Sequence, residues 1–150
     1  MTIELSQSEF AALEPAMPQF QGFGDPVNTR IPRNTQPSRE TTPNLLGIQF
    51  PWVDGRARIE ASGAKKALAC RLRYDGDFTY TLAATGPKRP MFIQFTENER
   101  FEDTAALRLH AMQFDATLLR EQIASQVYTS LNVPSPRTAY VELSIQVDNM

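Results

Sequence analysis

The chain has few residues of the two types that most often bind zinc, cysteine and histidine. Its one cysteine, Cys70, and one histidine, His110, cannot form a zinc cluster. Asp75 and Asp77 could together bind a cation, but an Asp-Gly-Asp sequence is first of all typical of a turn. Cys70 lies on the apolar face of a predicted strand and is expected to be a small core residue. His110, on another predicted strand, is more simply a packed or surface residue than a catalyst. We therefore expect no metal site.

Longer catalytic motifs are also absent from the sequence. There is no Gly-rich phosphate loop of the Walker or dinucleotide type, and no Gly-x-Ser-x-Gly nucleophile elbow. A net charge of -2 gives no reason to expect nucleic acid or an anionic membrane as a partner. No apolar run is long enough to span a bilayer, and the N-terminus lacks the regions of a signal peptide. The residues do not indicate a cellular location.

Composition divides the 150 residues into three segments. Residues 1–14 predict a short strand (3–5) and a helical turn, with Ser6 to Glu9 as a capping box. Residues 15–43 hold six of the eleven prolines and are interpreted as an extended linker. Residues 44–150 form the main folded domain, in a chain of ordinary globular composition with 41% hydrophobic residues.

The main domain shows mostly strand patterns. Leu68, Cys70, Leu72 and Tyr74 alternate with polar residues, which predicts a half-buried strand. A turn is expected at Asp54-Gly55, and a hairpin at Asp75-Gly76 because the alternation resumes at Phe78, Tyr80 and Leu82. Further strands are predicted over 45–50, 56–61, 91–95, 107–111 and 141–147.

A single long helix is predicted over 116–131. Leu119, Ile123, Val127 and Leu131 recur every fourth residue, which gives one apolar stripe. Asp115 is placed as its N-cap, and Asn132 as a left-handed C-terminal cap before two prolines. The predicted fold class is therefore α+β, an antiparallel sheet with one main packed helix.

Several segments, in order, resemble the CotH-type kinases, a family named for a bacterial spore-coat protein. The blocks are GIQFPW (47–52), RLRYDG (71–76), KRPMFIQF (88–95), LRLHAM (107–112) and the stretch 114–143, which includes VPSPRT (133–138). ELSQSEFAALEP (4–15) also resembles a segment that precedes the kinase core in some members.

The resemblance implies a small lobe of a divergent protein-kinase fold. Such kinases transfer phosphate from ATP to serines of coat or surface proteins, and members are often exported. By this likeness Lys88 would contact the ATP phosphates and Glu121 would hold it, with ATP and magnesium as cofactors of the complete domain. Without the likeness, Lys88 reads as a solvated turn residue and Glu121 as an exposed residue favoured by the helix dipole.

Two features depart from the family pattern. The turn after RLRY reads Asp-Gly-Asp-Phe (75–78) where the family usually has Gly-Asn-Ser, and Asn132 replaces a glycine. The aspartates that the kinase fold uses for catalysis and metal binding would follow Met150, in a C-terminal lobe. We therefore expect a truncated domain without catalytic residues of its own, inactive alone. The alternatives are a non-catalytic surface or spore-coat assembly module, and an unrelated small α+β protein.

Overall fold

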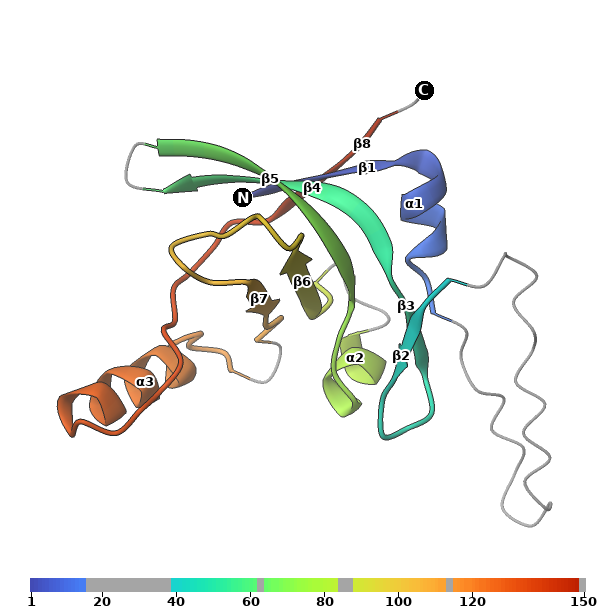
Figure 1. Ribbon diagram of the computed structural model, residues 1–150. Helices are drawn as coiled ribbons and strands as arrows, with labels where there is room; N and C mark the ends of the chain where they lie inside the picture. Colours follow the sequence, from blue (N-terminus) through green and yellow to red (C-terminus); the bar gives the residue numbers. More distant parts are fainter. Residues whose placement is uncertain (16–38, 62–63, 84–87, 113–114, 149–150) are drawn as a thin grey trace, which may run out of the picture.

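A six-stranded sheet forms the centre of the protein (Figure 1). The computed structural model describes residues 1–15, 39–61, 64–83, 88–112 and 115–148. The strand order is β7-β6-β5-β4-β1-β8, and all neighbours are antiparallel except β1 and β8, which are parallel. The strands are β1 (Thr2–Ser6), β4 (Val53–Ala61), β5 (Ala64–Tyr74), β6 (Met91–Phe95), β7 (Ala106–Leu109) and β8 (Ser144–Asp148). The α+β class predicted from the sequence is confirmed, and the arrangement is compatible with the small lobe of a kinase-like fold.

The core lies on one face of this sheet. In β5 the predicted alternation is confirmed, because Leu68, Cys70, Leu72 and Tyr74 are all buried. The ladder places Leu72 opposite Val53 of β4 on one side and Ile93 of β6 on the other. Since side chains along a strand alternate between faces, each of these strands contributes its apolar residues to the same layer.

Helix α1 (Gln7–Ala12) and the segment before it match the predicted N-terminal turn. The Ser6 side chain accepts the Glu9 N–H at 3.2 Å, which confirms the N-cap. The Glu9 carboxylate does not complete a capping box. It accepts two hydrogen bonds from Arg39, at 2.5 and 2.6 Å, and one from the Asp54 N–H at 3.0 Å. The bond from Arg39 is the main reason that the pKa of Glu9 lies below its usual range.

The predicted hairpin at Asp75-Gly76 is wrong. The chain leaves β5 and forms a short helix, α2 (Phe78–Ala83), in place of a strand. Tyr80 and Ala83, one helical turn apart, are both buried, whereas Phe78 is 69% and Leu82 52% exposed. Six residues are too few to separate a helical period from an alternating one in the sequence, and only the joint burial of Tyr80 and Ala83 distinguishes them.

The predicted turn at Asp54-Gly55 is also wrong, because both residues lie inside β4. Gly55 pairs with Cys70 of β5. A Cβ atom at Gly55 would come within 2.7 Å of a Leu5 methyl carbon, so the glycine allows β1 to approach closely. Glycine here serves packing between strands and not a change of chain direction.

A small hairpin stands beside the sheet, next to α2 (Figure 1). It pairs β2 (Thr41–Pro43) with β3 (Gln49–Pro51). Of the strand predicted over 45–50, only the last two residues therefore lie in a strand. The connection includes Gly47 at φ +78°, a left-handed conformation that glycine adopts readily. Ile48 and Phe50 are each 1% exposed and belong to the main core.

Helix α3 (Arg120–Ser130) starts four residues later than predicted. In Figure 1 it projects away from the sheet, and none of its residues is buried. The core takes its helical side chains from α1 and α2 instead, including Ala12 and Tyr80. The predicted stripe is therefore exposed, at 45% for Leu119, 52% for Ile123, 49% for Val127 and 65% for Leu131. Asn132 has φ 56°, which confirms the left-handed residue after the helix.

The division of the chain into segments 1–14, 15–43 and 44–150 remains a prediction. Residues 16–38 of the expected linker lie outside the described residues. Within the described part, β1 from the first segment is an interior strand of the main sheet. No helix among the described residues has the length and apolar character needed to cross a bilayer.

The environment of Cys70 leads to a prediction about its reactivity. Burial raises the pKa of the Cys70 thiol to about 11. Because the thiolate is the nucleophile, roughly one thiol in a thousand is reactive at pH 8. We expect the native protein to resist alkylation by iodoacetamide at pH 8 and the urea-unfolded protein to react fully, as measured by intact mass. Complete labelling of the native protein within minutes would contradict this packing.

Candidate functional site

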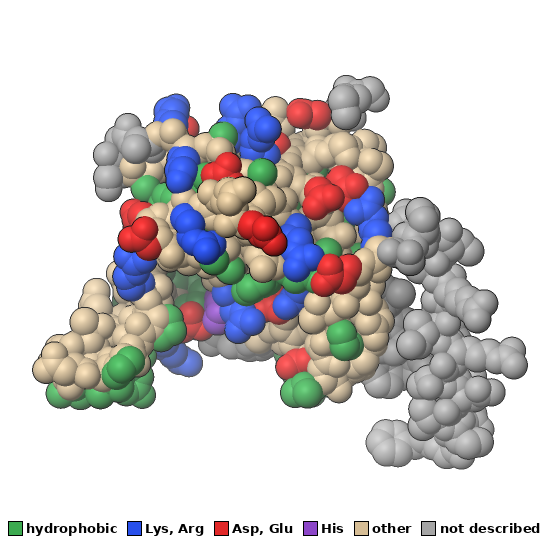
Figure 2. Space-filling view, in the orientation of Figure 1, with side chains coloured by type: hydrophobic (Ala, Val, Ile, Leu, Met, Phe, Trp, Pro, Cys, Tyr) green, Lys and Arg blue, Asp and Glu red, His purple; other side chains and the backbone are tan. Residues whose placement is uncertain are grey.

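An open pocket of about 580 Å³ lies between the ends of several elements. Four segments line it: residues 75–79 after β5, Pro90 before β6, residues of and after β7, and Asp115 with the first turn of α3. Figure 2 shows charged side chains of both signs in the hollow between α2 and α3. A volume of this size is typical of small-molecule sites.

Asp75 fixes the wall of the pocket that follows β5. One carboxylate oxygen accepts a hydrogen bond from Arg73 Nη1 at 2.7 Å, and the other lies 2.9 Å from Arg108 Nε. Its backbone N–H donates to the Pro90 carbonyl at 3.0 Å. Asp75 therefore ties together three strands, β5, β6 and β7, at the point where the pocket begins.

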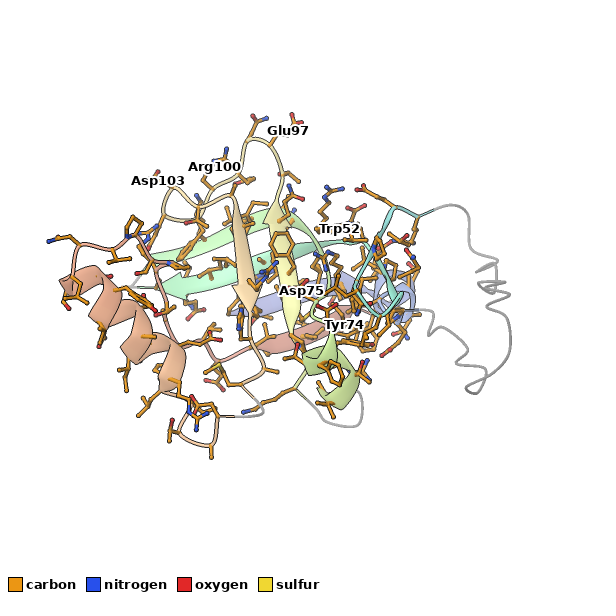
Figure 3. All side chains as sticks on the ribbon, turned by 90° about the horizontal axis from the view of Figure 1, so that it is seen from below. Trp52, Tyr74, Asp75, Glu97, Arg100 and Asp103 are labelled. Carbon is orange, nitrogen blue, oxygen red and sulfur yellow. The ribbon has the colours of Figure 1, made fainter. Side chains whose placement is uncertain are left out.

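Arg73 makes this tie necessary, because it is a buried cation at 8% exposure. Its guanidinium lies 5.2 Å from the ring centres of both Trp52 and Phe92. The guanidinium of Arg71 also lies over the Trp52 ring, 4.4 Å from its centre. Within the described part of the chain, Arg73 Nε is buried without a hydrogen-bond partner. Among the described residues, the Asp75 carboxylate is the only anionic partner of Arg73. Figure 3 shows Trp52, Tyr74 and Asp75 grouped near α2.

Asp77 has a structural partner as well. Its Oδ1 accepts the Leu45 N–H at 2.8 Å, and its carbonyl accepts the Thr81 N–H of α2 at 3.2 Å. The expectation that Asp75 and Asp77 are turn residues agrees with these contacts. Among the described residues, no three His, Cys, Asp or Glu side chains are arranged to hold a metal ion.

Asp115 holds the start of α3, although the helix begins five residues later. Its buried carboxylate accepts the Thr117 hydroxyl at 2.6 Å and the Arg120 N–H at 2.8 Å. The Thr117 hydroxyl bond is the largest cause of a pKa below the usual range for Asp115, followed by the bond from the Arg120 N–H. The ionised Asp115 side chain therefore caps the helix. More residues separate it from the first residue of the helix than the sequence predicts.

Glu121 lies on the first turn of α3 and lines the pocket. Its carboxylate contacts His110 Nδ1 at 2.8 Å, with both side chains about half exposed. The contact joins α3 to the end of β7. An exposed pair of this kind contributes at most about 1 kcal/mol, so it orients the glutamate more than it stabilises the fold.

Lys88 lies two residues before Pro90, on the segment that leads into β6. Its side chain is exposed, and it is not among the residues that line the pocket. Pro90 does line it, so the segment itself reaches the pocket edge. The pairing of Lys88 with Glu121 remains a prediction.

Comparison with known families identifies the segment that builds this pocket. The model of the family described as "CotH kinase protein" matches residues 72–150, which is more than half of the chain. The chain belongs to the CotH kinase protein family. All residues that line the pocket fall inside the CotH match, from Asp75 to Glu121. No curated protein and no solved structure gives a significant match.

The contact of His110 with Glu121 is a feature of the pocket that the sequence does not predict. A lone histidine on a strand indicates only a packed or surface residue. The position of His110 in the LRLHAM block of the CotH resemblance was the available signal. Its contact with Glu121 joins residues eleven positions apart, and strand and helix periodicity do not indicate such a contact.

The burial of Arg73 leads to a prediction about Asp75. Asp75→Asn leaves the Arg73 guanidinium buried without a counter-charge, and we expect the free energy of unfolding to fall by about 3 kcal/mol. Urea denaturation followed by circular dichroism measures the change. The control is Glu60→Gln, which removes an exposed pair with Lys65 and should change the free energy by less than about 0.5 kcal/mol. Equal effects of the two substitutions would refute the buried-pair role.

Proposed function

We propose that this chain is the small lobe of a CotH-type kinase and binds ATP in the pocket between α2 and α3. The complete kinase would transfer phosphate from ATP to serines of coat or surface proteins, in a bacterial spore or cell envelope. The observation that carries the proposal is that the CotH-matched segment supplies every residue that lines the pocket.

The lining suits a ligand with an apolar ring and a charged tail. Phe78, Pro90, Ala111 and Met112 offer apolar surface. Polar and charged groups from β7 and α3 lie beside them, including Arg108 and Glu121. Ligand sites of this class combine a mostly apolar lining with a few polar groups that set the orientation.

Lys88 and Glu121 are the proposed ATP-phosphate lysine and its partner. A flexible ammonium has to be held near the phosphates, and a carboxylate on a helix can restrain it. Glu121 is at the pocket, and the segment of Lys88 reaches the pocket edge at Pro90. Glu121 now contacts His110, so pairing with Lys88 would require the glutamate to exchange or share partners.

The remaining parts of a kinase site are assigned in this proposal to a second lobe. Transfer of phosphate requires carboxylates that hold magnesium and a group that orients the hydroxyl. The described residues do not fit a metal site, so no step is assigned to a metal here. The uncharged face of α3, with exposed Ile123, Val127 and Leu131, is a suitable surface for such a lobe to cover. Figure 2 shows hydrophobic side chains along the lower edge of α3.

A non-catalytic binding module is the second candidate. The observation in its favour is the loop after β5, where both aspartates have structural partners. Asp75 binds Arg73 and Arg108, and Asp77 binds the Leu45 N–H. A loop committed to such contacts can serve a structural role without touching phosphate.

ATP binding tests the proposed site. We expect an ATP titration followed by ¹H–¹⁵N NMR to shift amides of residues 75–79 and 108–112. Lys88→Ala should weaken binding by about tenfold, because it removes a charge-assisted hydrogen bond to phosphate. The matched control, Lys65→Ala, removes an exposed lysine of β5 and should leave the affinity unchanged. Equal affinities of the two variants would exclude Lys88 as the phosphate ligand.

A phosphate-transfer assay distinguishes the kinase lobe from the binding module. It compares the 150-residue chain with a longer product that includes any downstream coding sequence. We expect the 150-residue chain alone to transfer no phosphate from radiolabelled ATP to a serine-rich acceptor. The longer product should transfer phosphate if the kinase proposal is right, and Glu121→Gln should reduce the rate. Transfer by the short chain that Lys88→Ala abolishes would show that the catalytic groups lie within it.

A further inference from the structure

The hairpin of β2 and β3 holds the loop that forms one wall of the pocket. Two hydrogen bonds join its turn to this loop, across more than thirty positions in the sequence. Asn44 Nδ2 donates to the Gly76 carbonyl at 3.0 Å, and the Leu45 N–H donates to Asp77 Oδ1 at 2.8 Å. The hairpin, residues 41–51, lies outside the CotH match over 72–150.

Asn44 performs two separable tasks with the two ends of its amide. Its Oδ1 accepts the Leu46 N–H at 3.0 Å and the Ile48 N–H at 2.9 Å, which shapes the hairpin turn. Its Nδ2 reaches across to Gly76. An asparagine is suited to this position because it is both donor and acceptor.

Apolar packing makes the hairpin and α2 one unit. The ring of Phe50 in β3 meets the ring of Tyr80 in α2 edge to face, with centroids 4.9 Å apart. Tyr80 also contacts Tyr74 of β5 at 5.5 Å. Such aromatic contacts are specific in geometry, so a displacement of the hairpin would be transmitted to α2.

The loop itself is tightly turned at Gly76. Gly76 has φ +97°, and a Cβ atom there would come within 2.3 Å of Thr79 Oγ1. On the side of β5, Asp75 is tied to Arg73 and Arg108. The hairpin provides the opposite support, so the loop is held from both sides next to the pocket.

We propose that the hairpin is a clamp that positions residues 75–79 for the ligand of the pocket, and that Asn44 is its positioning residue. The identity of the ligand as ATP rests on the proposed function, whereas the clamp itself rests on the contacts alone. Asn44 acts through Gly76 and does not line the pocket. Loss of the Asn44 donor should therefore loosen the loop and lower the affinity for the ligand, while the hairpin stays folded.

Asn44→Asp removes this donor and adds a negative charge at the same place. Aspartate keeps the oxygen that accepts the Leu46 and Ile48 N–H groups but cannot donate to Gly76. We expect exchange of the Leu46 and Ile48 amides to stay at the wild-type rate and that of amides 76–81 to rise about fivefold. ATP affinity should fall by a similar factor, as expected for one lost hydrogen bond. Wild-type exchange at 76–81 in this variant would overturn the proposal.

Asp77 provides a second test from the loop side, for the case that Asn44→Asp disturbs the hairpin. Asp77→Ala removes the acceptor of the Leu45 N–H, whereas Asp77→Asn keeps an oxygen there and loses the same charge. We expect the Leu45 amide to exchange faster and ATP to bind more weakly in Asp77→Ala than in Asp77→Asn. Identical behaviour of the two variants would reject the clamp.

The outcomes distinguish this inference from the proposed function. If the wild-type protein binds no ATP, the kinase-lobe proposal fails, and the amide exchange data alone decide the clamp. If ATP binds equally well to wild type, Asn44→Asp and Asp77→Ala, the kinase-lobe proposal stands and the clamp is wrong.

Discussion

The ion pair between Asp75 and the buried Arg73 is the contact on which the pocket side of the sheet depends. Arg73 lies against the rings of Trp52 and Phe92, which contact each other, and has no other anionic partner in the described part of the chain. A buried cation is costly unless a carboxylate is held against it. Asp75 also binds Arg108 and the Pro90 carbonyl, so the need to neutralise one arginine aligns the ends of β5, β6 and β7.

The two walls of the pocket are built by different forces. The wall after β5 rests on the buried pair, on the hairpin contacts from Asn44 and on aromatic packing around Tyr80. Helix α3, on the other wall, has no buried residue and is attached through polar contacts, chiefly those of Asp115 and the pair of Glu121 with His110. Elements with few buried contacts open at a lower free energy than the core. We therefore expect the wall that carries the glutamate to open at the lower free energy of the two.

This asymmetry fits the proposed small lobe of a CotH-type kinase. In a kinase site, the position of the helix that carries the glutamate controls whether the lysine–glutamate pair is in place. The exposed apolar stripe of α3 would then be a surface that a second lobe covers, and its burial would fix the position of Glu121. In a binding module, the same rigid loop and exposed helix would instead present a docking surface beside the pocket.

The sequence by itself determined the strands with clear alternation, as in the run around Leu72, and the family to which the chain belongs. It also indicated the helix that carries Glu121. The tertiary structure alone decided that Tyr80 lies in a helix, that the α3 stripe is exposed, and that His110 and Asn44 support the pocket. The reason is physical: alternation and helical period report which face of an element is apolar. They do not report which other element covers that face. Contacts such as that of Asn44 with Gly76 join residues distant in the sequence, and only the packing of the whole chain brings them within hydrogen-bond distance.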